Sequence, residues 1–412
     1  MNSRFWLIAV LGGLAITQAW AVSRPSPRVL QVGPARTLQA PSQAARVARD
    51  GDTVEIDAGE YRGDAAIWRA HGLKIRSVGG MALLRAAGAS AEQKAIWVIK
   101  GNDTTVDGIG FLDARVADRN GAGIRLEGRN LTVRNSLFRD NENGILTGQN
   151  PDSEVLVEHT EFDHNGYGDG QSHNLYVGAI RRFTLRFSYS HTARVGHQVK
   201  SRAAENHILY NRIADDAGGR SSYLIDLPAG GLSYVAGNVL HQGALAENYT
   251  MVSYGAEKLM HPVNRLYVLH NTFVNDREQG CRALFVASGA EKALMLNNLM
   301  VDCAKTDGPV LEGNTVTASR ASLMNAAQGD LRPRPGSAAV DRGMSCAALE
   351  RLDLSCPEMH YLHPLRFEPR RIQGAPDAGA YESPQGSAAP SPAPEGAKGN
   401  RGGPSFSRVS GR

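Results

Sequence analysis

A short stretch of alternating apolar and polar residues recurs along most of this chain, and each copy holds an anchor residue, often asparagine, at the same place. The anchors are Gly108, Asn135, His159, Phe187, Asn211, Asn238, Asn271 and Asn298. Successive anchors are separated by 24 to 33 residues. This period is too short for a propeller blade of about 40 residues, and the copies lack the helical pattern of ankyrin or tetratricopeptide repeats. The repeat therefore indicates a stack of short strands.

Coils of short strands and polar turns are typical of a parallel β-helix, in which each coil packs on its neighbours. We therefore predict an all-β fold, a single-stranded, right-handed parallel β-helix. Asparagine tolerates the left-handed backbone of a sharp bend, and stacked asparagine side chains can hydrogen-bond along a ladder, so the anchor asparagines are expected to be structural. Residues 41–49 (PSQAARVAR) predict a short N-terminal helix that caps the first coil.

The two ends of the chain differ in composition from its middle. Residues 1–21 combine a basic start, a short apolar run and a final Ala-Trp-Ala, which predicts a signal peptide cleaved after Ala21. Residues 383–412 are basic, rich in Gly, Pro and Ser, and without apolar periodicity, which predicts a disordered tail. The β-helix domain is expected over residues 22–382. No other run approaches the roughly 18 apolar residues of a membrane helix, so we expect a secreted or periplasmic protein.

The cysteines and the charge limit the chemistry of the chain. Cys281, Cys303, Cys346 and Cys356 predict two disulfides in an exported protein, and the pairing of nearest neighbours in sequence is a hypothesis. The net charge is +4 and the pI about 8.9, which suits an acidic partner. This surplus is too small to indicate nucleic acid. We expect a monomer that binds an acidic polysaccharide.

One strand precedes each anchored strand by about ten residues, and four of these strands carry polar side chains of interest. They read HNLYVG (173–178), HQVKSR (197–202), SYLIDLP (222–228) and YTMVSYGAE (249–257). Stacked coils would place them side by side on one face, about 4.8 Å apart. Alternation predicts outward side chains at Asn174, Tyr176, Gln198, Lys200, Arg202, Leu224 and Asp226. The fourth strand is ambiguous, because Met251 and Val252 are both apolar.

We interpret this face as a polysaccharide-binding cleft. The predicted catalytic residues are Lys200, Arg202, Tyr176 and His173. The predicted substrate-binding residues are Asn174, His197, Gln198, Tyr223, Asp226, Tyr254 and Glu257. For His173 and His197 a turn-stabilising role is the alternative, because both share the parity of inward residues. For Asp226 the alternative is a surface ion pair with Lys200, worth about 0–1 kcal/mol.

Three segments resemble the opening and closing motifs of the pectate-lyase-like β-helix superfamily. They are GDTVEIDAGEY (51–61), PGSAAVDRG (335–343) and DAGAYE (377–382). The resemblance covers nearly the whole mature chain and implies its fold. It does not imply one reaction, because the superfamily includes lyases, hydrolases, epimerases and binding proteins.

The segment VKSRAAENHILYN is similar to a segment of alginate- and chondroitin-type lyases, in which the lysine of a VKS strand is the general base. The similarity implies that Lys200 is the base. Those lyases carry an arginine on the next coil, in an RHG motif, where this chain has Asp226-Leu227-Pro228. Arg202 could replace that arginine.

No cofactor is identified from the sequence, and no metal ligand is assigned. The acidic residues that hold calcium in the similar lyases are absent from ARVGHQ (193–198), although calcium bound by Asp or Asn oxygens stays open. There is no phosphate-cradling glycine loop and no zinc-ligand spacing.

The lyase reaction fits the cationic pair on this face. Removal of the proton beside a uronate carboxylate requires that negative charge be stabilised, which Lys200 and Arg202 could do. A neutral lysine or histidine could take the proton, and Tyr176 could donate one to the leaving oxygen. A C5-epimerase shares the first step and stays open.

Two other functions remain as alternatives. A glycoside hydrolase needs two carboxylates about 5–10 Å apart, which Asp226 with Glu257, or Asp163 with Asp169, could supply. The clustered aspartates of pectin-degrading hydrolases are missing, so this function ranks second. A non-catalytic protein could bind sugars by stacking them on its tyrosines.

Overall fold

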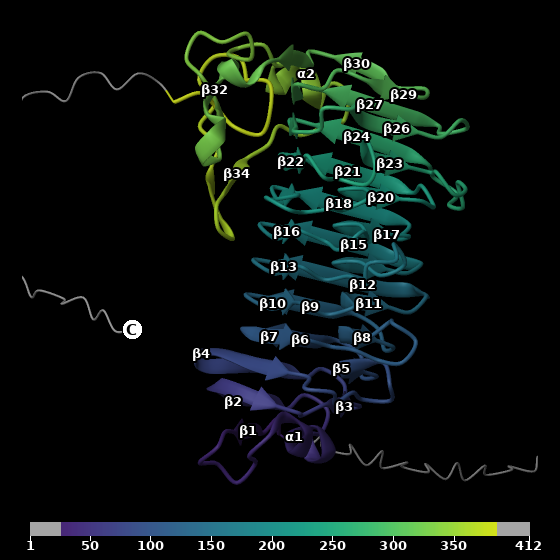
Figure 1. The fold of residues 1–412 in the computed structure, drawn as a ribbon, viewed down its shortest axis with the longest axis vertical. Coiled ribbons are helices and arrows are strands. Elements are labelled where there is room, and N and C mark those ends of the chain that lie inside the picture. The colour runs from purple at the N-terminus through teal and green to yellow at the C-terminus, as the bar shows by residue number, and fades with distance from the viewer. Residues whose placement is uncertain (1–25, 385–412) are drawn as a thin grey trace, which may run out of the picture.

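The computed structural model describes residues 26–384 and confirms the predicted all-β, right-handed parallel β-helix (Figure 1). The predicted signal peptide, 1–21, and nearly all of the predicted tail, 383–412, lie outside the described residues. The strands of successive coils pair in parallel and form one 21-stranded sheet and one 10-stranded sheet. No helix of the described chain is long and apolar enough to cross a membrane.

The 10-stranded sheet, sheet B, forms one face of the solenoid and carries the candidate site. Its strands are β3 (Ala66–Trp68), β5 (Ala95–Ile99), β8 (Ala122–Leu126), β11 (Asn143–Thr147), β14 (Leu175–Val177), β17 (Val199–Ser201), β20 (Ile225–Leu227), β23 (Thr250–Tyr254), β26 (Arg282–Val286) and β29 (Thr306–Asp307).

The 21-stranded sheet, sheet A, wraps around the two other faces, because the long strand β4 pairs with one strand of each face. The first face holds β1 (Val29–Val32), β2 (Thr53–Arg62), β4 (Lys74–Arg85), β6 (Thr104–Asp107), β9 (Leu131–Arg134), β12 (Asn150–Glu158), β15 (Ile180–Arg186), β18 (Glu205–Leu209), β21 (Leu232–Ala236), β24 (Arg265–Leu269), β27 (Lys292–Leu296) and β30 (Leu311–Gly313). The second holds β7 (Ile109–Leu112), β10 (Leu137–Arg139), β13 (Glu161–Asp163), β16 (Tyr189–His191), β19 (Arg212–Ala214), β22 (Val239–Gln242), β25 (Thr272–Asn275), β28 (Leu299–Val301) and β31 (Val316–Ala318).

The predicted asparagine ladder is confirmed at the bend between the two faces of sheet A. The ladder consists of Asn211, Asn238, Asn271 and Asn298, all fully buried. In each step, the backbone N–H and the Nδ2 of one asparagine donate to the Oδ1 of the next, at 2.9–3.0 Å. These bonds satisfy buried polar groups that would otherwise be costly.

The expected left-handed bend is one residue displaced in the second half of the chain. There the left-handed residues precede the ladder asparagines; they are Tyr210, Gly237, His270 and Asn297. In the first half, the anchors Gly108, Asn135, His159 and Phe187 are themselves left-handed. Up to Phe187 the anchor itself is the left-handed residue, and from Asn211 on the left-handed residue comes one position before the anchor. The sequence repeat was aligned on asparagine, which does not hold a fixed place relative to the left-handed backbone.

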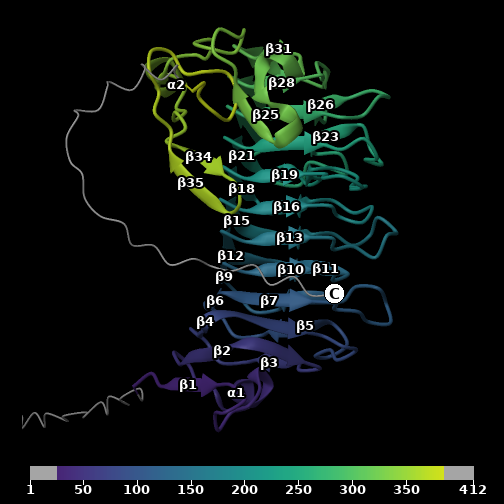
Figure 2. The ribbon, with the colours of Figure 1, turned by 60° about the vertical axis from the view of Figure 1, so that its left-hand side comes forward.

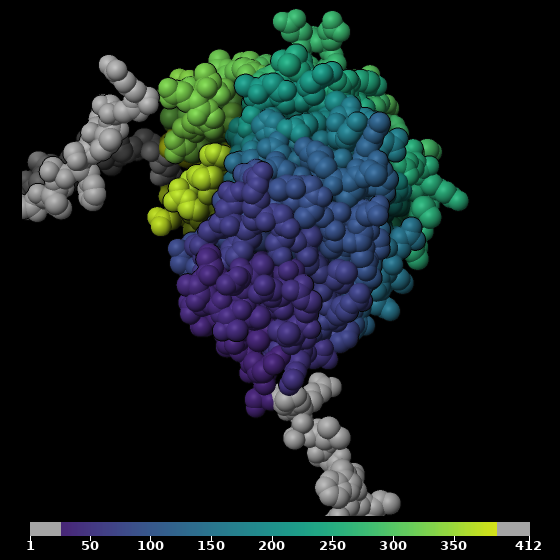
Figure 3. Space-filling model, turned by 60° about the horizontal axis from the view of Figure 1, so that its bottom comes forward, coloured from purple at the N-terminus to yellow at the C-terminus, as the bar shows by residue number. Residues whose placement is uncertain are grey.

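The interior is a continuous apolar core that runs along the solenoid axis. Five aromatic rings follow one another along it with centroids 4.9–5.1 Å apart: Trp68, Trp97 and Phe111 meet edge to face, and Phe111, Phe138 and Phe162 stack. Helix α1 (Pro41–Val47) buries Pro41 and Ala44 at the N-terminal end and confirms the predicted cap. Figure 3 shows this end from below, closed by the first residues of the described chain.

Beyond the last coil the chain turns back along the solenoid (Figure 2). This return contains the 3-10 helices η1 (Arg320–Ser322) and η2 (Ala326–Gln328), strands β32 (Leu323–Asn325) and β33 (Asp330–Pro333), helix α2 (Cys346–Glu350) and the hairpin β34 (Met359–Leu362) and β35 (Arg366–Pro369). Phe367 of the hairpin stacks on Phe187 with centroids 4.2 Å apart. The disulfides are Cys281–Cys303 and Cys346–Cys356, as the nearest-neighbour hypothesis predicted.

Candidate active site

A single row of side chains runs along the outside of sheet B. The strand register places Tyr176 beside Lys200 and Lys200 beside Asp226, on β14, β17 and β20. The prediction that these three share one face is confirmed. The row as a whole is Ile67, Val98, Arg125, Leu146, Tyr176, Lys200, Asp226, Ser253, Phe285 and Asp307.

The predicted outward orientation of Asn174, Gln198 and Leu224 is wrong, because all three are fully buried. Each lies just before its three-residue strand, in the bend, where the alternation of a strand does not apply. Asn174 Nδ2 donates to Gln198 Oε1 at 2.6 Å, and Gln198 Nε2 donates to Asp215 Oδ1 at 3.0 Å. Asn174 and Gln198 are therefore part of a second buried amide ladder, out of reach of a substrate.

His173 and His197 form the scaffold beneath the row. Their rings stack with centroids 4.6 Å apart. The Nδ1 atom of His173 accepts from the backbone N–H of His197 at 3.0 Å, and the Nδ1 of His197 accepts from that of Tyr223 at 3.2 Å. Burial lowers the pKa of His197 to about 3 and that of His173 well below its usual value. This geometry favours the turn-stabilising alternative over catalysis by His173, since its Nδ1 is already occupied.

Lys200 lies between two carboxylates. Its Nζ is 3.5 Å from Asp226 Oδ2 and 3.5 Å from Glu257 Oε1. The side chains of Lys200 and Asp226 are 13% and 4% exposed, whereas that of Glu257 is 52% exposed. Burial raises the pKa of Asp226 to about 6, although Lys200 opposes the shift. The alternative of an ion pair between Asp226 and Lys200 is thus confirmed, but the pair is buried and not on the surface as expected.

Arg202 holds a carboxylate with both arms of its guanidinium. Its Nη1 and Nη2 lie 2.7 and 2.8 Å from the two oxygens of Glu257, and its Nε donates to the hydroxyl of Tyr176 at 2.9 Å. The hydrogen bond from Arg202 lowers the pKa of Glu257. Two-bond pairs of this kind are geometrically specific for carboxylates. Glu257 belongs to the segment after β23, and its contact with Arg202 brings this segment beside the row.

Of the two tyrosines predicted to bind substrate, Tyr254 is buried and Tyr223 is partly exposed. Tyr254 is fully buried, and its hydroxyl donates to the carbonyl of Gly231 at 2.6 Å, so its predicted role in stacking on sugars is wrong. Its inward direction resolves the ambiguous fourth strand, where Val252 and Tyr254 face the core. Tyr223 remains partly exposed and lies tilted against His197, with centroids 5.0 Å apart.

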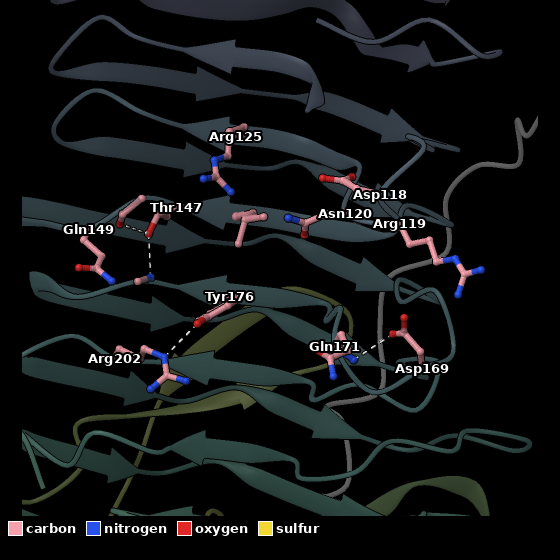
Figure 4. A pocket seen from close by; sticks show the side chains of 13 residues that line it. Asp118, Arg119, Asn120, Arg125, Thr147, Gln149, Asp169, Gln171, Tyr176 and Arg202 are labelled. Atoms are coloured by element: carbon pink, nitrogen blue, oxygen red, sulfur yellow. Dashed lines mark hydrogen bonds between the residues drawn. The ribbon is translucent and has the colours of Figure 1, made fainter. Parts of the chain in front are cut away.

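A cavity of about 530 Å³ adjoins the row on its N-terminal side. Tyr176 and Arg202 line it together with three residues that the sequence reasoning missed, Arg125, Gln149 and Gln171. Figure 4 shows Arg125 and Arg202 on opposite sides of Tyr176. Arg125 has the same outward place on β8 that Lys200 has on β17, so alternation in AGIRL (122–126) would have identified it.

The two carboxylate pairs considered for hydrolysis differ in placement. Asp226 and Glu257 meet at Lys200. Asp163, in contrast, lies on β13 of sheet A, bonded to Arg139, whereas Asp169 lines the cavity beside sheet B. Asp163 and Asp169 are therefore on different faces.

One group within residues 26–384 brings three potential metal ligands together, and it lies away from the row. Glu161, Asp163 and His191 of β13 and β16 offer atoms within 4.8 Å of one another. Although burial opposes it, hydrogen bonds with Asp216 and Glu161 raise the pKa of His191 to about 9. Arg139 lies 3.4 Å from Glu161 and 2.7 Å from Asp163, so these groups form an ion-pair cluster on sheet A.

The parallel β-helix of the described residues is the fold of the pectate-lyase-like β-helix superfamily. The chain is similar to pectate lyase Pel9A, with a TM-score of 0.57 and 13% identity over 88% of this chain and 98% of that chain. It is also similar to an alginate lyase from Paenibacillus sp. str. FPU-7 (TM-score 0.42, 12% identity, 70% of this chain and 99% of that chain). A pectin methylesterase from Aspergillus niger matches with a TM-score of 0.33 and 9% identity, over 73% of this chain and 88% of that chain.

At these identities the likeness is one of fold. No family model and no curated protein sequence matches the chain. What the site does must therefore be argued from its own geometry.

Proposed function

We propose that the protein is a polysaccharide lyase that cleaves an acidic, uronate-containing glycan by β-elimination. The observation that carries the proposal is the carboxylate of Glu257, held by Arg202 directly beside the Nζ of Lys200. Because Glu257 is half exposed, a substrate carboxylate can take its place on Arg202 without unfolding the coil. The carbon that bears that carboxylate would then lie next to Lys200.

In the proposed reaction, the amine form of Lys200 takes the proton from the carbon beside the uronate carboxylate. Arg202 stabilises the negative charge that moves onto this carboxylate. The electron pair then forms the carbon–carbon double bond, and the bond to the 4-linked oxygen breaks. Tyr176, whose hydroxyl already contacts Arg202, donates its proton to this leaving oxygen. Return of the proton from Lys200 to Tyr176 restores both groups.

Asp226 has a positioning role in this proposal. Its buried carboxyl lies 3.5 Å from Lys200 Nζ and 3.5 Å from His197 Nε2, and it therefore fixes the direction of the lysine side chain. It occupies the place where the similar lyases carry an arginine. Arg202, on the same coil as the base, supplies the cation instead.

A glycoside hydrolase is the second candidate, favoured by one observation. Burial raises the pKa of Asp226 to about 6, whereas Arg202 lowers the pKa of Glu257. Carboxyl groups whose pKa values are pushed apart are suited to the acid and base roles of hydrolysis. We rank this function below the lyase, because Glu257 is already paired with Arg202.

The test uses the whole protein and a panel of alginate, polygalacturonate, glycosaminoglycans and bacterial exopolysaccharides. A lyase yields products that absorb ultraviolet light through their new double bond. Lys200→Ala should abolish this signal, with the unfolding midpoint within a few degrees of wild type. Lys74→Ala, which removes an exposed lysine from sheet A, is the control.

Other results on the same panel would contradict the proposal. New reducing ends without absorbance would identify a hydrolase. Inverted sugars without cleavage would identify a C5-epimerase. Full activity in Lys200→Ala would exclude this lysine as the base.

We also propose that the protein acts outside the cytoplasm as a monomer. The two disulfides support an oxidising compartment. Cell fractionation would locate the protein, and light scattering would give its mass in solution. A reduced, cytoplasmic protein would contradict export.

A further inference from the structure

Arg125 lies on the floor of the cavity. It projects outward from β8, and it forms no ion pair or hydrogen bond with any residue in the described range 26–384. Its Nε is buried and unpaired. A partly buried guanidinium without a partner carries a desolvation cost that binding of an anion would relieve.

Two other arginines on this face, Arg202 just after β17 and Arg282 in β26, do have carboxylate partners. Arg202 pairs with Glu257 at 2.7 Å, and Arg282 of β26 pairs with Asp307 at 2.6 Å. Arg125 is therefore the exception among these three arginines.

The charges along the row also differ between its two ends. On the C-terminal side of Lys200 lie Asp226 and Asp307 of the row, with Glu257 beside them. On the N-terminal side, the row itself carries Arg125, Leu146 and Tyr176, with no acid among them.

The walls of the cavity contribute both signs of charge. Arg119 lies 4.5 Å from the centroid of the Tyr167 ring and forms no ion pair with a described residue. Asp118 and Asp169 line the same cavity. Arg202 is neutralised by Glu257, so Arg119 and Arg125 stand against two acids and the cavity carries no net charge. The attraction for an anion therefore comes from the unpaired guanidinium of Arg125 rather than from a surplus of cations.

We infer that Arg125 binds a second acid group of the same polyanionic chain whose reacting sugar lies at Lys200. The two residues are separated by three strand steps, through Leu146 and Tyr176, or about 14 Å at the usual spacing of strands. The polymer then runs parallel to the solenoid axis, from Lys200 toward the N-terminus. Its sugar faces pack on Tyr176 and on the apolar side chain of Leu146.

The placement of the reacting sugar at Lys200 rests on the proposed function. The contact of the polymer with Arg125 does not require catalysis. Because the strands of Arg125 and Lys200 lie about 14 Å apart, more than one sugar is needed to span them. The arrangement therefore selects oligomers over single sugars and disfavours neutral polymers.

The experiment measures binding in the Lys200→Ala background, so that the probe is not consumed. The probes are size-fractionated oligouronates from alginate and polygalacturonate, and the same polymers with their carboxylates reduced to alcohols. Arg125→Ala should weaken binding of long oligouronates about tenfold, the loss of a partly buried charge-assisted bond, and change binding of the shortest ones less than twofold. Arg125→Lys should recover part of the loss.

Arg181→Ala is the matched control, because it removes an exposed arginine from β15 of sheet A. It should leave all affinities unchanged. Equal affinity of Arg125→Ala and its parent for long oligouronates would overturn the inference, as would an equal loss for the carboxyl-reduced polymers. Binding that depends on Arg125, without any unsaturated product from the wild-type protein, would refute the lyase and leave the anion site standing.

Discussion

The guanidinium of Arg202 and the carboxylate of Glu257 form a two-bond ion pair across the candidate site, with N–O distances of 2.7 and 2.8 Å. Glu257 thereby occupies the surface of Arg202 that a substrate carboxylate would need. The segment after β23 would therefore compete with the proposed acidic substrate for this arginine.

Replacement of Glu257 by glutamine should ease this competition. We expect Glu257→Gln to lower the KM for an acidic polymer about fivefold, the order expected for a half-exposed ion pair, with little change in kcat. Steady-state kinetics would measure both constants. Glu154→Gln, which removes a carboxylate paired with Arg181 on sheet A, is the control. A higher KM in Glu257→Gln would mean that Glu257 positions Arg202 for the substrate rather than competing with it.

Tyr176 is expected to act on the leaving oxygen. Tyr176→Phe removes the hydroxyl but keeps the ring, so kcat should fall about 100-fold while KM changes much less. Tyr234→Phe on β21 of sheet A is the comparison, since it removes a hydroxyl outside the site. An unchanged kcat would assign the proton donor to another group.

Acid should destabilise the fold through His197. Its pKa is lowered to about 3 in the folded protein, whereas an unfolded histidine titrates near 6.5. The unfolded chain thus binds more protons between these values, and stability falls as the pH drops below about 6.5. The loss should reach about 3 kcal/mol two pH units lower.

His197→Asn tests this effect. The amide oxygen can still accept from the N–H of Tyr223, but the side chain does not titrate. Chemical unfolding at pH 7 and pH 4.5 should show a smaller loss in the variant than in the wild type. Equal losses in both proteins would show that other groups cause the acid sensitivity.

The asparagine ladder should be essential to stability. Asn238→Ala removes bonds to Asn211, Asn271 and the carbonyl of Ile208, and leaves buried groups unpaired. We expect a loss of about 2–4 kcal/mol in the free energy of unfolding. Asn102→Ala, which removes one exposed hydrogen bond with Arg129, should cost at most about 1 kcal/mol. Similar costs for both variants would contradict a stabilising ladder.

Much of the fold was predictable, because a repeated period of strands leaves few architectures. The row was predictable at Tyr176, Lys200 and Asp226, which lie at the centres of their strands. Alternation failed at Asn174 and Gln198, because strands of three residues give way to bends immediately beside the site.

Two features of the site depended on tertiary structure. The contact between Glu257 and Arg202 joins the segment after β23 to a residue just after β17, 55 positions earlier, and no local pattern encodes it. The lack of a partner for Arg125 within residues 26–384 depends on which residues surround it in the folded chain, so the sequence could not show it. Its outward direction, in contrast, could have been read from the alternation of β8.

The return of the C-terminal hairpin changes how the solenoid should come apart. In a simple repeat protein each coil contacts only its neighbours, and the end coils fray first. Here Phe367 stacks on Phe187, and the Nδ1 of His159 contacts the carbonyl of Leu365 at 2.8 Å, so residues from the end of the chain rest on coils in its middle. The terminal coils cannot open without releasing these contacts. The C-terminal half, including the coils that carry Lys200 and Glu257, is thus expected to melt as one cooperative unit.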